Sequence, residues 1–259
     1  MNPIEQFQQE RAERIAAYGK DAEFQALSLK WIEESMRRMY VYNFDWMGRP
    51  IIQYPQDIVG MQELIWKVKP DLIIETGIAH GGSLIFSASM LALLDMCEAI
   101  QSGSSFNPAQ SKRKVIGIDI DIREHNRAEI EAHPMASRIQ MIQGSSIAPE
   151  TVAQVKKAAE GYKNVLVCLD SMHTDAHVFA ELEAYAPMVS VGSYCAVFDT
   201  LVEDMPRGFY PDRPWDVGDN PKTAVRRWIK DHPEFVTEQS VDHKLMITVT
   251  SEGFLRRIA

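Results

Sequence analysis

The sequence predicts an α/β fold in which helices cover both faces of a parallel β-sheet. From residue 71 onward, short apolar runs alternate with amphipathic segments, which is the pattern of repeated strand–helix–strand units. A chain of 259 residues with 46% apolar residues is also long enough to bury one sizeable core. The formal net charge of −9 argues against a nucleic-acid-binding protein, because neutralising phosphates requires a net basic surface.

Five apolar runs have the length and boundaries of buried strands. The expected strands are Leu72–Glu75, Val115–Asp119, Ile139–Ile142, Val165–Asp170 and Tyr194–Asp199. The amphipathic segments between them are expected to be the helices Ser83–Cys97, Ile122–Ala132, Pro149–Ala159 and Asp175–Tyr185. Two later apolar runs, Phe235–Gln239 and Lys244–Thr250, are expected to form a hairpin at the edge of the sheet.

Residues 1–48 are expected to be a helical extension, followed by one main domain over residues 49–259. Apolar side chains such as Phe24, Leu27 and Trp31 recur in the extension at helical spacing. These helices would cover a face of the sheet, contact another subunit or close over a pocket. The stretch 202–222 is an irregular, proline-rich loop whose length is typical of a lid or a binding loop.

A glycine-rich turn at residues 75–83 is the strongest chemical signal, since it follows the first expected strand and opens a helix. Its glycines let the backbone approach a ligand, and the helix N-terminus favours negative groups. The order G-x-A-x-G-G departs from the dinucleotide fingerprint. The carboxylate of Glu75 would repel a diphosphate but stabilise an ammonium or sulfonium group. S-adenosylmethionine carries both cations, and the expected residues for it are Glu75, Gly77, Ala79, His80, Gly81, Gly82 and Ser83.

Polar residues after the second and third strands would bind the rest of that cofactor. Asp119, followed by Ile120, ends the second strand, where a carboxylate can accept hydrogen bonds from ribose hydroxyls. Ser145 and Ser146 follow the third strand and would line an adenine pocket, or form only a turn and a helix cap. Asp121 is expected to be the N-cap of the next helix.

Two carboxylates and a histidine follow the fourth and fifth strands. In an open parallel sheet the carboxyl ends of the strands face the ligand crevice, so Asp170, His173 and Asp199 should meet there. Asp170 and Asp199 could hold a divalent cation through oxygen ligands. His173 is the candidate general base, because an imidazole titrates near neutral pH. Asp170 could take that role without a metal, or Asp170 and Asp175 could be simple caps and His173 a surface residue.

These motifs, in this order, resemble those of the class I S-adenosylmethionine-dependent methyltransferases. More narrowly, they resemble the cephalosporin hydroxylase family, which includes sugar and natural-product O-methyltransferases. The resemblance runs from about Trp46 to the C-terminus, and its most specific parts are the A-H-G-G-S turn and the D-S-x-H-T segment. The motifs that carry it are E-T-G-x-A-x-G-G-S from Glu75, G-I-D-I-D from Gly117, Q-G-S-S from Gln143, L-D-S-x-H from Leu169 and V-x-D-T from Val197.

The resemblance implies a Rossmann-like, seven-stranded methyltransferase sheet and methyl transfer to a hydroxyl of a sugar or natural product. It also implies magnesium between Asp170 and Asp199. The family usually has an acidic residue just before the second of these, where this chain has Phe198, so one ligand is missing. The alternatives are an oxygenase component of a natural-product pathway, a non-catalytic cofactor-binding subunit and a nicotinamide oxidoreductase.

The expected partners and location follow from the same features. The acceptor would be a small molecule or a glycan, and relatives of this kind tend to form homo-oligomers. The apolar stretch 85–94 is too short to span a bilayer, which predicts no integral membrane segment. Three widely spaced cysteines and the lack of a secretory signal predict a cytoplasmic protein.

Overall fold

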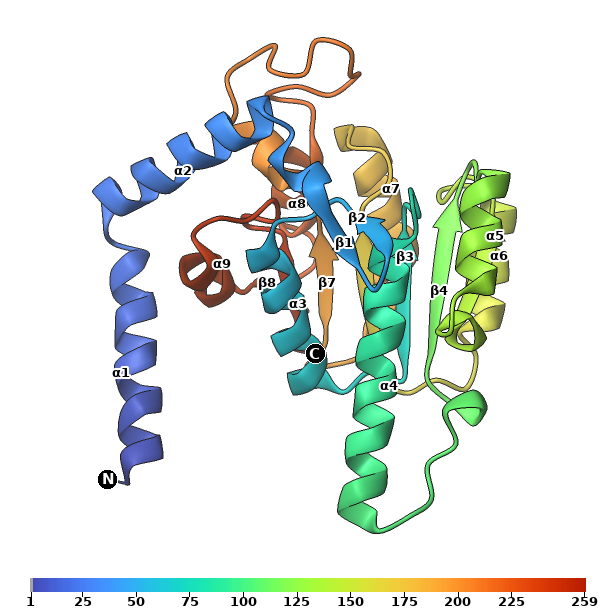
Figure 1. Ribbon diagram of the computed structural model, residues 1–259. Coiled ribbons are helices and arrows are strands. Elements are labelled where there is room, and N and C mark those ends of the chain that lie inside the picture. Colours follow the sequence, from blue (N-terminus) through green and yellow to red (C-terminus); the bar gives the residue numbers. More distant parts are fainter. Residues whose placement is uncertain (1) are drawn as a thin grey trace.

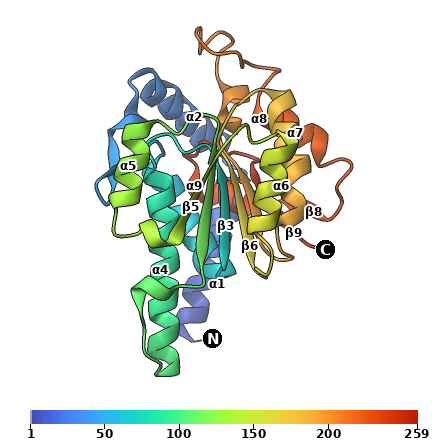
Figure 2. The ribbon, with the colours of Figure 1, turned by 90° about the vertical axis from the view of Figure 1, so that its right-hand side faces the viewer.

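A computed structural model describes residues 2–259, apart from the side chain of Ala109, and contains a seven-stranded mixed sheet between two layers of helices (Figures 1 and 2). The strand order is β5-β4-β3-β6-β7-β9-β8. The first five strands in this order, β5, β4, β3, β6 and β7, are parallel to one another. Strand β9 is antiparallel to both of its neighbours, β7 and β8. The strands are β3 (Leu72–Thr76), β4 (Lys114–Asp119), β5 (Ile139–Gln143), β6 (Val165–Leu169), β7 (Tyr194–Val197), β8 (Phe235–Thr237) and β9 (Phe254–Arg257).

Alternate side chains of each strand enter two separate hydrophobic cores, as the pleat of a strand requires. Ile73 packs into the core under one helical layer, whereas Leu72 and Ile74 pack into the core under the other. The first layer contains α3 (Pro55–Val68), α4 (Gly82–Ser102) and α5 (Glu124–Ala132). The second contains α6 (Pro149–Ala158), α7 (Asp175–Tyr185) and α8 (Pro221–Trp228). The predicted fold class is confirmed, and the predicted strands and helices of this core are present with small shifts at their ends.

Helix α4 is longer than predicted and is the one described helix that is long and apolar enough, by length and composition, to cross a membrane. It spans 21 residues, and 56% of its most apolar stretch is buried inside the protein. Leu84, Leu91 and Leu94 belong to the first core, which is the environment of a central helix in a globular domain. The apolar character of α4 is therefore explained by packing against the sheet.

The predicted C-terminal hairpin is wrong. The run Phe235–Thr237 does form β8, but its partner is β9, and residues 244–250 form no strand. A short helix, α9 (Gln239–Leu245), precedes a turn in which the Thr248 hydroxyl and the Val249 amide donate hydrogen bonds to the buried carboxylate of Asp57. Because these groups bind the Asp57 carboxylate in the interior, the segment cannot lie along the edge of the sheet and pair with β8.

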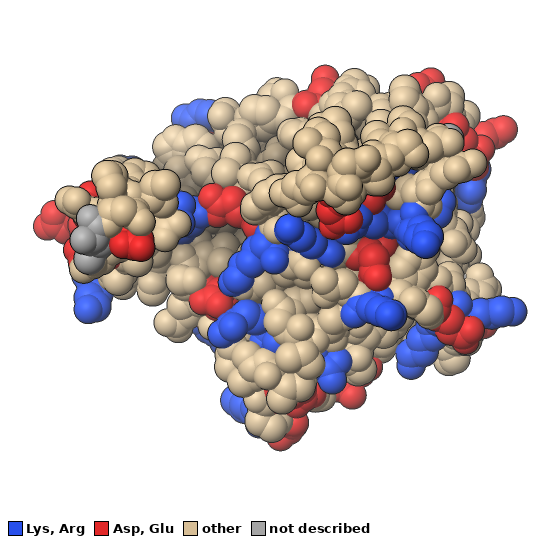
Figure 3. Space-filling view, turned by 90° about the horizontal axis from the view of Figure 1, so that it is seen from below, with Lys and Arg blue, Asp and Glu red and all other residues tan. Residues whose placement is uncertain are grey.

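The N-terminal segment forms an arm and a hairpin. Helix α1 (Pro3–Tyr18) has no buried side chain, so it does not cover a face of the sheet. Its N-terminal half stands away from the body of the molecule (Figures 1 and 3). Helix α2 (Ala22–Arg37) is followed by a 3-10 turn (Tyr40–Asn43) and by the hairpin β1 (Phe44–Trp46) and β2 (Arg49–Ile51). The domain boundary expected at residue 48 falls between the two strands of this hairpin.

Candidate functional site

A cavity of about 440 Å³ lies at the carboxyl ends of the parallel strands, where the strand order reverses between β3 and β6. Ligands of open α/β sheets bind at this position. Four parts of the chain supply most of the cavity lining, and Val249 completes it. These parts are the glycine-rich turn after β3, the strand ends 170–173 and 198–202, the segment 36–53 and the loop 210–215. The sequence predicted the first two, and the lid role of the 202–222 loop was one of its expectations.

At two positions of the turn, the main chain of another segment comes so close that only glycine fits. Gly77 has φ +87°, and a Cβ atom there would lie 2.0 Å from the main-chain oxygen of Asp170. A Cβ atom on Gly82 would lie 2.2 Å from the main-chain oxygen of Pro50. The turn is thus packed between the loop after β6 and the N-terminal hairpin, and any side chain at either glycine would displace it.

Five of the seven residues predicted on this turn line the cavity, namely Gly77, Ala79, His80, Gly82 and Ser83. Gly81 is the N-cap of α4, and a Cβ atom there would meet the side chain of Ile130 rather than the cavity.

Glu75 lies behind the turn and is only 3% exposed. Its carboxylate accepts a hydrogen bond from the Ser83 hydroxyl. Burial raises its pKa to about 7, an effect that the hydrogen bonds from Ser83 and Ser87 partly offset. Glu75 lines a second, inner cavity of about 10 Å³, which shares Ser83 and Asp170 with the main cavity. The carboxylate is therefore placed at the inner end of the site.

Asp119 holds the turn through main-chain amides. Its Oδ2 accepts hydrogen bonds from the amides of Ile78 at 2.8 Å and Ala79 at 3.4 Å, and Oδ1 accepts one from the Asp121 amide at 3.0 Å. Its neighbour Ile120 is 71% exposed. The predicted cap at Asp121 is wrong, because α5 begins at Glu124 and its N-cap is Arg123. The acidic side chain is not needed as a cap because the chain extends two residues further before it turns into the helix.

Ser146, after β5, belongs to a polar network that joins this loop to Ser171 and helix α7. The Ser146 hydroxyl lies 3.0 Å from Nε2 of His177, which also lies 3.2 Å from the Ser171 hydroxyl. Ser171 donates in turn to Glu181 at 2.7 Å, and the Tyr185 hydroxyl donates to the main-chain oxygen of Ser146 at 2.5 Å. Neither Ser146 nor its neighbour Ser145 lines the main cavity.

Sequence reasoning missed His177. Its position in the first turn of α7, four residues after His173, was the available signal, because this turn directly follows a strand end that carries site residues.

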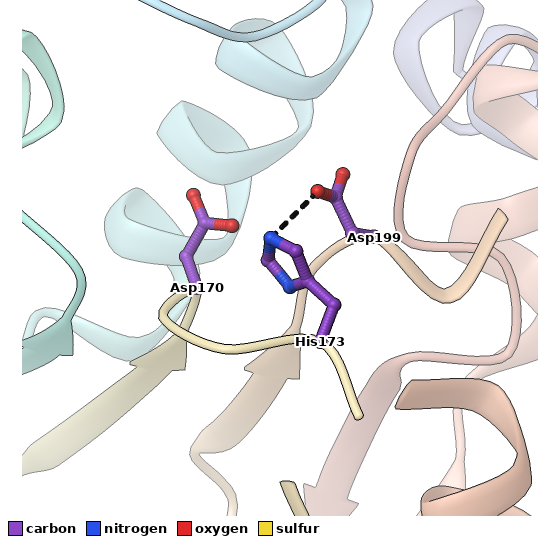
Figure 4. Close-up of side chains that lie close together, drawn as sticks. All are labelled: Asp170, His173 and Asp199. Carbon is purple, nitrogen blue, oxygen red and sulfur yellow. Dashed lines mark ion pairs between the residues drawn. The ribbon is translucent and has the colours of Figure 1, made fainter. Parts of the chain in front are cut away.

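Asp170, His173 and Asp199 meet at the mouth of β6 and β7, as the sequence predicted. One ligand atom from each lies within 4.8 Å of the other two, and Nε2 of His173 is 3.0 Å from Oδ2 of Asp199 (Figure 4). Asp199 has φ +55°, so the chain turns sharply after β7 and directs the carboxylate toward the cluster. Burial, and then the nearby carboxylates of Asp199 and Glu75, raise the pKa of Asp170 well above its usual range. Two carboxylates and an imidazole are a suitable ligand set for a divalent cation.

Phe198 stands where the family resemblance implies an acidic ligand. Its side chain is 3% exposed and lines both cavities beside Asp170. It belongs to the first core, so the position contributes apolar packing. The cluster therefore contains two carboxylates, those of Asp170 and Asp199, and the imidazole of His173 is the third possible ligand.

Aromatic residues of the 202–222 loop close the outer side of the cavity. The indole of Trp215 packs edge-on against the imidazole of His173, with ring centroids 4.6 Å apart. The Arg213 guanidinium lies over the same indole at 5.3 Å. Arg37, at the end of α2, lies over the ring of Phe209 at 4.7 Å, so the N-terminal helix and this loop contact each other above the cavity.

Comparison with known proteins places these features in a family context. Residues 38–258 match the family described as Rhamnosyl O-methyltransferase/CmcI. The Rhamnosyl O-methyltransferase of Mycobacterium leprae is 26% identical over 233 residues, which cover 87% of this chain and 90% of that protein. The protein of the same name from Mycobacterium bovis (strain BCG / Pasteur 1173P2) is 25% identical over 238 residues, with 87% and 85% covered.

Two solved structures of CmcI have the same fold. One is described as a complex with magnesium and S-adenosylmethionine, and it matches with a TM-score of 0.55 and 16% identity over 84% of this chain and 78% of that one. The apo structure matches with a TM-score of 0.57 and 18% identity, over 84% and 77%.

Proposed function

The chain belongs to the Rhamnosyl O-methyltransferase/CmcI family, and from that premise we propose that it is an S-adenosylmethionine-dependent O-methyltransferase acting on a sugar hydroxyl. The observation that carries the proposal is the cluster of Asp170, His173 and Asp199 at the same cavity as the glycine-rich turn. The turn offers a backbone surface for the methyl donor, and the cluster offers acid–base groups for a hydroxyl beside it.

The charges around the inner end of the cavity suit a cationic donor. Glu75 and Asp170 lie there, and no Lys or Arg lines the inner cavity among the described residues. S-adenosylmethionine carries an ammonium and a sulfonium group, both of which buried carboxylates stabilise. Asp119 supports the same donor by holding the amides of Ile78 and Ala79 in the turn.

His173 would take the proton of the acceptor hydroxyl as the oxygen attacks the methyl carbon and the carbon–sulfur bond breaks. Oδ2 of Asp199, 3.0 Å from Nε2, would stabilise the protonated imidazole. The cavity walls would hold acceptor and donor in line, and such positioning supplies much of the rate in a displacement of this kind.

The residues present also fit a divalent cation. Asp170 and Asp199 converge from two neighbouring loops and would hold the cation through one carboxylate oxygen each, which leaves the imidazole of His173 free to act as the base. Magnesium bound there would lower the pKa of an acceptor hydroxyl. Because Phe198 supplies no ligand, acceptor oxygens or water would complete the coordination.

The acceptor would be a sugar because the outer cavity combines aromatic and polar groups. Trp215 and Tyr210 offer aromatic surfaces, and Arg213 offers hydrogen-bond donors at the entrance. The Mycobacterium relatives carry the name rhamnosyl O-methyltransferase, so a deoxyhexose at the end of a glycan is the class to test first.

The proposal includes a homo-oligomer in the cytoplasm. The exposed apolar side chains of the N-terminal arm support contacts with another copy of the chain, since Phe7 is 56% exposed and Leu27 is 63% exposed. All three cysteines are free, in keeping with a reducing compartment. The formal net charge of −9 supports an acceptor other than nucleic acid.

Methyl-labelled S-adenosylmethionine, offered with a panel of rhamnosides and other glycosides, tests this function. We expect label on a sugar oxygen and equimolar S-adenosylhomocysteine. Transfer that requires no glycoside, or the absence of transfer to every glycoside in the presence of magnesium, would contradict the proposal. Oxygen consumption with added iron would favour the oxygenase alternative instead.

A further inference from the structure

We propose that the side chain of Gln53 binds the amino-acid end of S-adenosylmethionine, an inference that rests on the proposed function. Gln53 follows β2 in the short link between the N-terminal hairpin and α3. It is 6% exposed, yet it lines both the main cavity and the inner cavity. The family resemblance covers this residue but gives it no role, and it reaches the site because the hairpin forms a wall of the cavity.

The side-chain oxygen of Gln53 lacks a hydrogen-bond partner among the residues that the structure describes. Its Oε1 is buried and accepts no hydrogen bond from any described residue. Leaving a buried acceptor unpaired destabilises a folded protein, and each such group in a native structure calls for an explanation. A bound molecule that donates a hydrogen bond to Oε1 would supply the missing interaction.

The chain around Gln53 holds its side chain at this place. Ile51 is 1% exposed, and Tyr54 is fully buried with its hydroxyl 2.6 Å from that of Ser35. Pro55 then begins α3. These contacts hold the backbone on both sides of Gln53, so the side chain starts from a fixed point at the wall of the cavity.

The groups around the amide indicate what it would bind. Ser83 and Asp170 line both cavities with Gln53, and Glu75 lies just behind them. Two carboxylates beside an acceptor oxygen form a site for a group that is cationic and carries hydrogen-bond donors. The α-ammonium of S-adenosylmethionine has both properties, whereas the aromatic outer cavity, with Tyr210 and Trp215, is the part suited to a sugar.

Gln56 provides a matched control within the same chain. Its Oε1 is also buried without a partner among the described residues, three positions further along, but it lines neither cavity. A substitution at Gln56 therefore removes the same kind of atom without touching the site.

The test compares the binding of two probes by calorimetry. S-adenosylhomocysteine contains the amino-acid end, and 5′-methylthioadenosine lacks it. For Gln53→Met we expect at least tenfold weaker binding of S-adenosylhomocysteine, about 1.4 kcal/mol, and unchanged binding of 5′-methylthioadenosine. Gln56→Met should bind both probes as the wild type does. The ligand-free melting temperature of Gln53→Met should not fall, because the substitution removes an unpaired buried atom.

Wild-type affinity of Gln53→Met for S-adenosylhomocysteine would overturn the inference, and so would an equal loss of both probes. If Gln53→Met does not fold, Gln53→Asn replaces it, since the shorter amide cannot reach the same point and should give the same selective loss. Failure of the wild-type protein to bind either probe would contradict the proposed function itself, and this outcome is distinct from a failure confined to Gln53.

Discussion

Arg49 of the N-terminal hairpin holds the main-chain oxygen of His80 in the glycine-rich turn, with Nε at 3.0 Å and Nη2 at 2.7 Å. Nη2 also donates to Oδ1 of Asn126, whose Nδ2 donates to the main-chain oxygen of Ala79 at 3.0 Å. Ala79 has φ +45°, a left-handed conformation that is unfavourable for a residue with a side chain. The hairpin and α5 together therefore hold the turn in the shape that faces the cavity.

Replacing Arg49 should weaken binding at the turn. We expect Arg49→Ala to bind S-adenosylhomocysteine about tenfold more weakly, because two carbonyl groups lose their donors and the strained turn relaxes. Arg49→Lys should be intermediate, since an ammonium group cannot make the same forked contact. Arg14→Ala, on the exposed face of α1, is the control. Equal affinities of Arg49→Ala and the wild type in a calorimetric titration would show that the turn holds its shape without Arg49.

Replacing His173 should reduce turnover without changing donor binding. Loss of a general base lowers kcat by about 10²- to 10⁴-fold, so we expect His173→Ala to show a loss in that range at pH 7. The affinity for S-adenosylhomocysteine should be within twofold of the wild type. His125→Ala, on the exposed face of α5, should retain full activity. Normal kcat in His173→Ala would assign the proton transfer to another group, such as Asp170.

Asp199 should be needed for divalent cations. Manganese titrated into the protein in the presence of S-adenosylhomocysteine should bind at one site, and Asp199→Asn should weaken that binding at least tenfold because the cluster loses one of its two carboxylates. Asp212→Asn, in the exposed part of the 202–222 loop, controls for the loss of one negative charge. Turnover that is unaffected by a chelator would contradict a role for the metal in the reaction.

The stability of the protein should fall between about pH 4 and pH 7. Burial raises the pKa of Asp57 to about 7, although hydrogen bonds from Thr248 and Val249 oppose the shift. The unfolded chain loses this proton near pH 4, so in that window the native state binds more protons and the free energy of unfolding decreases as the pH rises. When measured by urea unfolding, the free energy of unfolding decreases from pH 5 to pH 8. This decrease should be smaller by roughly 2 kcal/mol in Asp57→Asn than in the wild type. The same decrease in both proteins would contradict the assignment.

Trp215 should affect the acceptor and not the donor. Its indole packs on His173 and lines the outer cavity. Removing an aromatic surface of this kind costs about 1 kcal/mol, so we expect Trp215→Ala to raise the acceptor KM about fivefold or more, with unchanged affinity for S-adenosylhomocysteine. Trp66→Ala, 48% exposed on α3, is the matched control. If Trp215→Ala changed only the affinity for S-adenosylhomocysteine, the indole would belong to the donor site and the prediction would be contradicted.

The local patterns of the sequence were sufficient to predict the parallel core and the residues at its strand ends. Asp170, His173 and Asp199 meet because parallel strands end at the same edge, and that rule needs no knowledge of packing. The C-terminal pairing was not predictable in this way. The run 244–250 has the composition of a strand, but its Thr248 hydroxyl donates a hydrogen bond to the buried carboxylate of Asp57, 191 residues earlier in the chain.

The walls of the site also depend on contacts that the sequence order hides. Arg49 and Asn126 are 77 residues apart, and neither belongs to a motif. Gln53 became notable only because the packed structure leaves its Oε1 without a partner. Such features arise when distant segments pack together, so periodicity and spacing carry no signal for them.

Calorimetric titration of the wild-type protein with S-adenosylhomocysteine tests the central claim most directly, with NADH titrated in parallel. The acidic inner end of the cavity and the absence of a dinucleotide fingerprint predict binding of S-adenosylhomocysteine at one site per chain in the micromolar range and no binding of NADH. Binding of NADH, with no heat from S-adenosylhomocysteine at high micromolar concentration, would contradict the account.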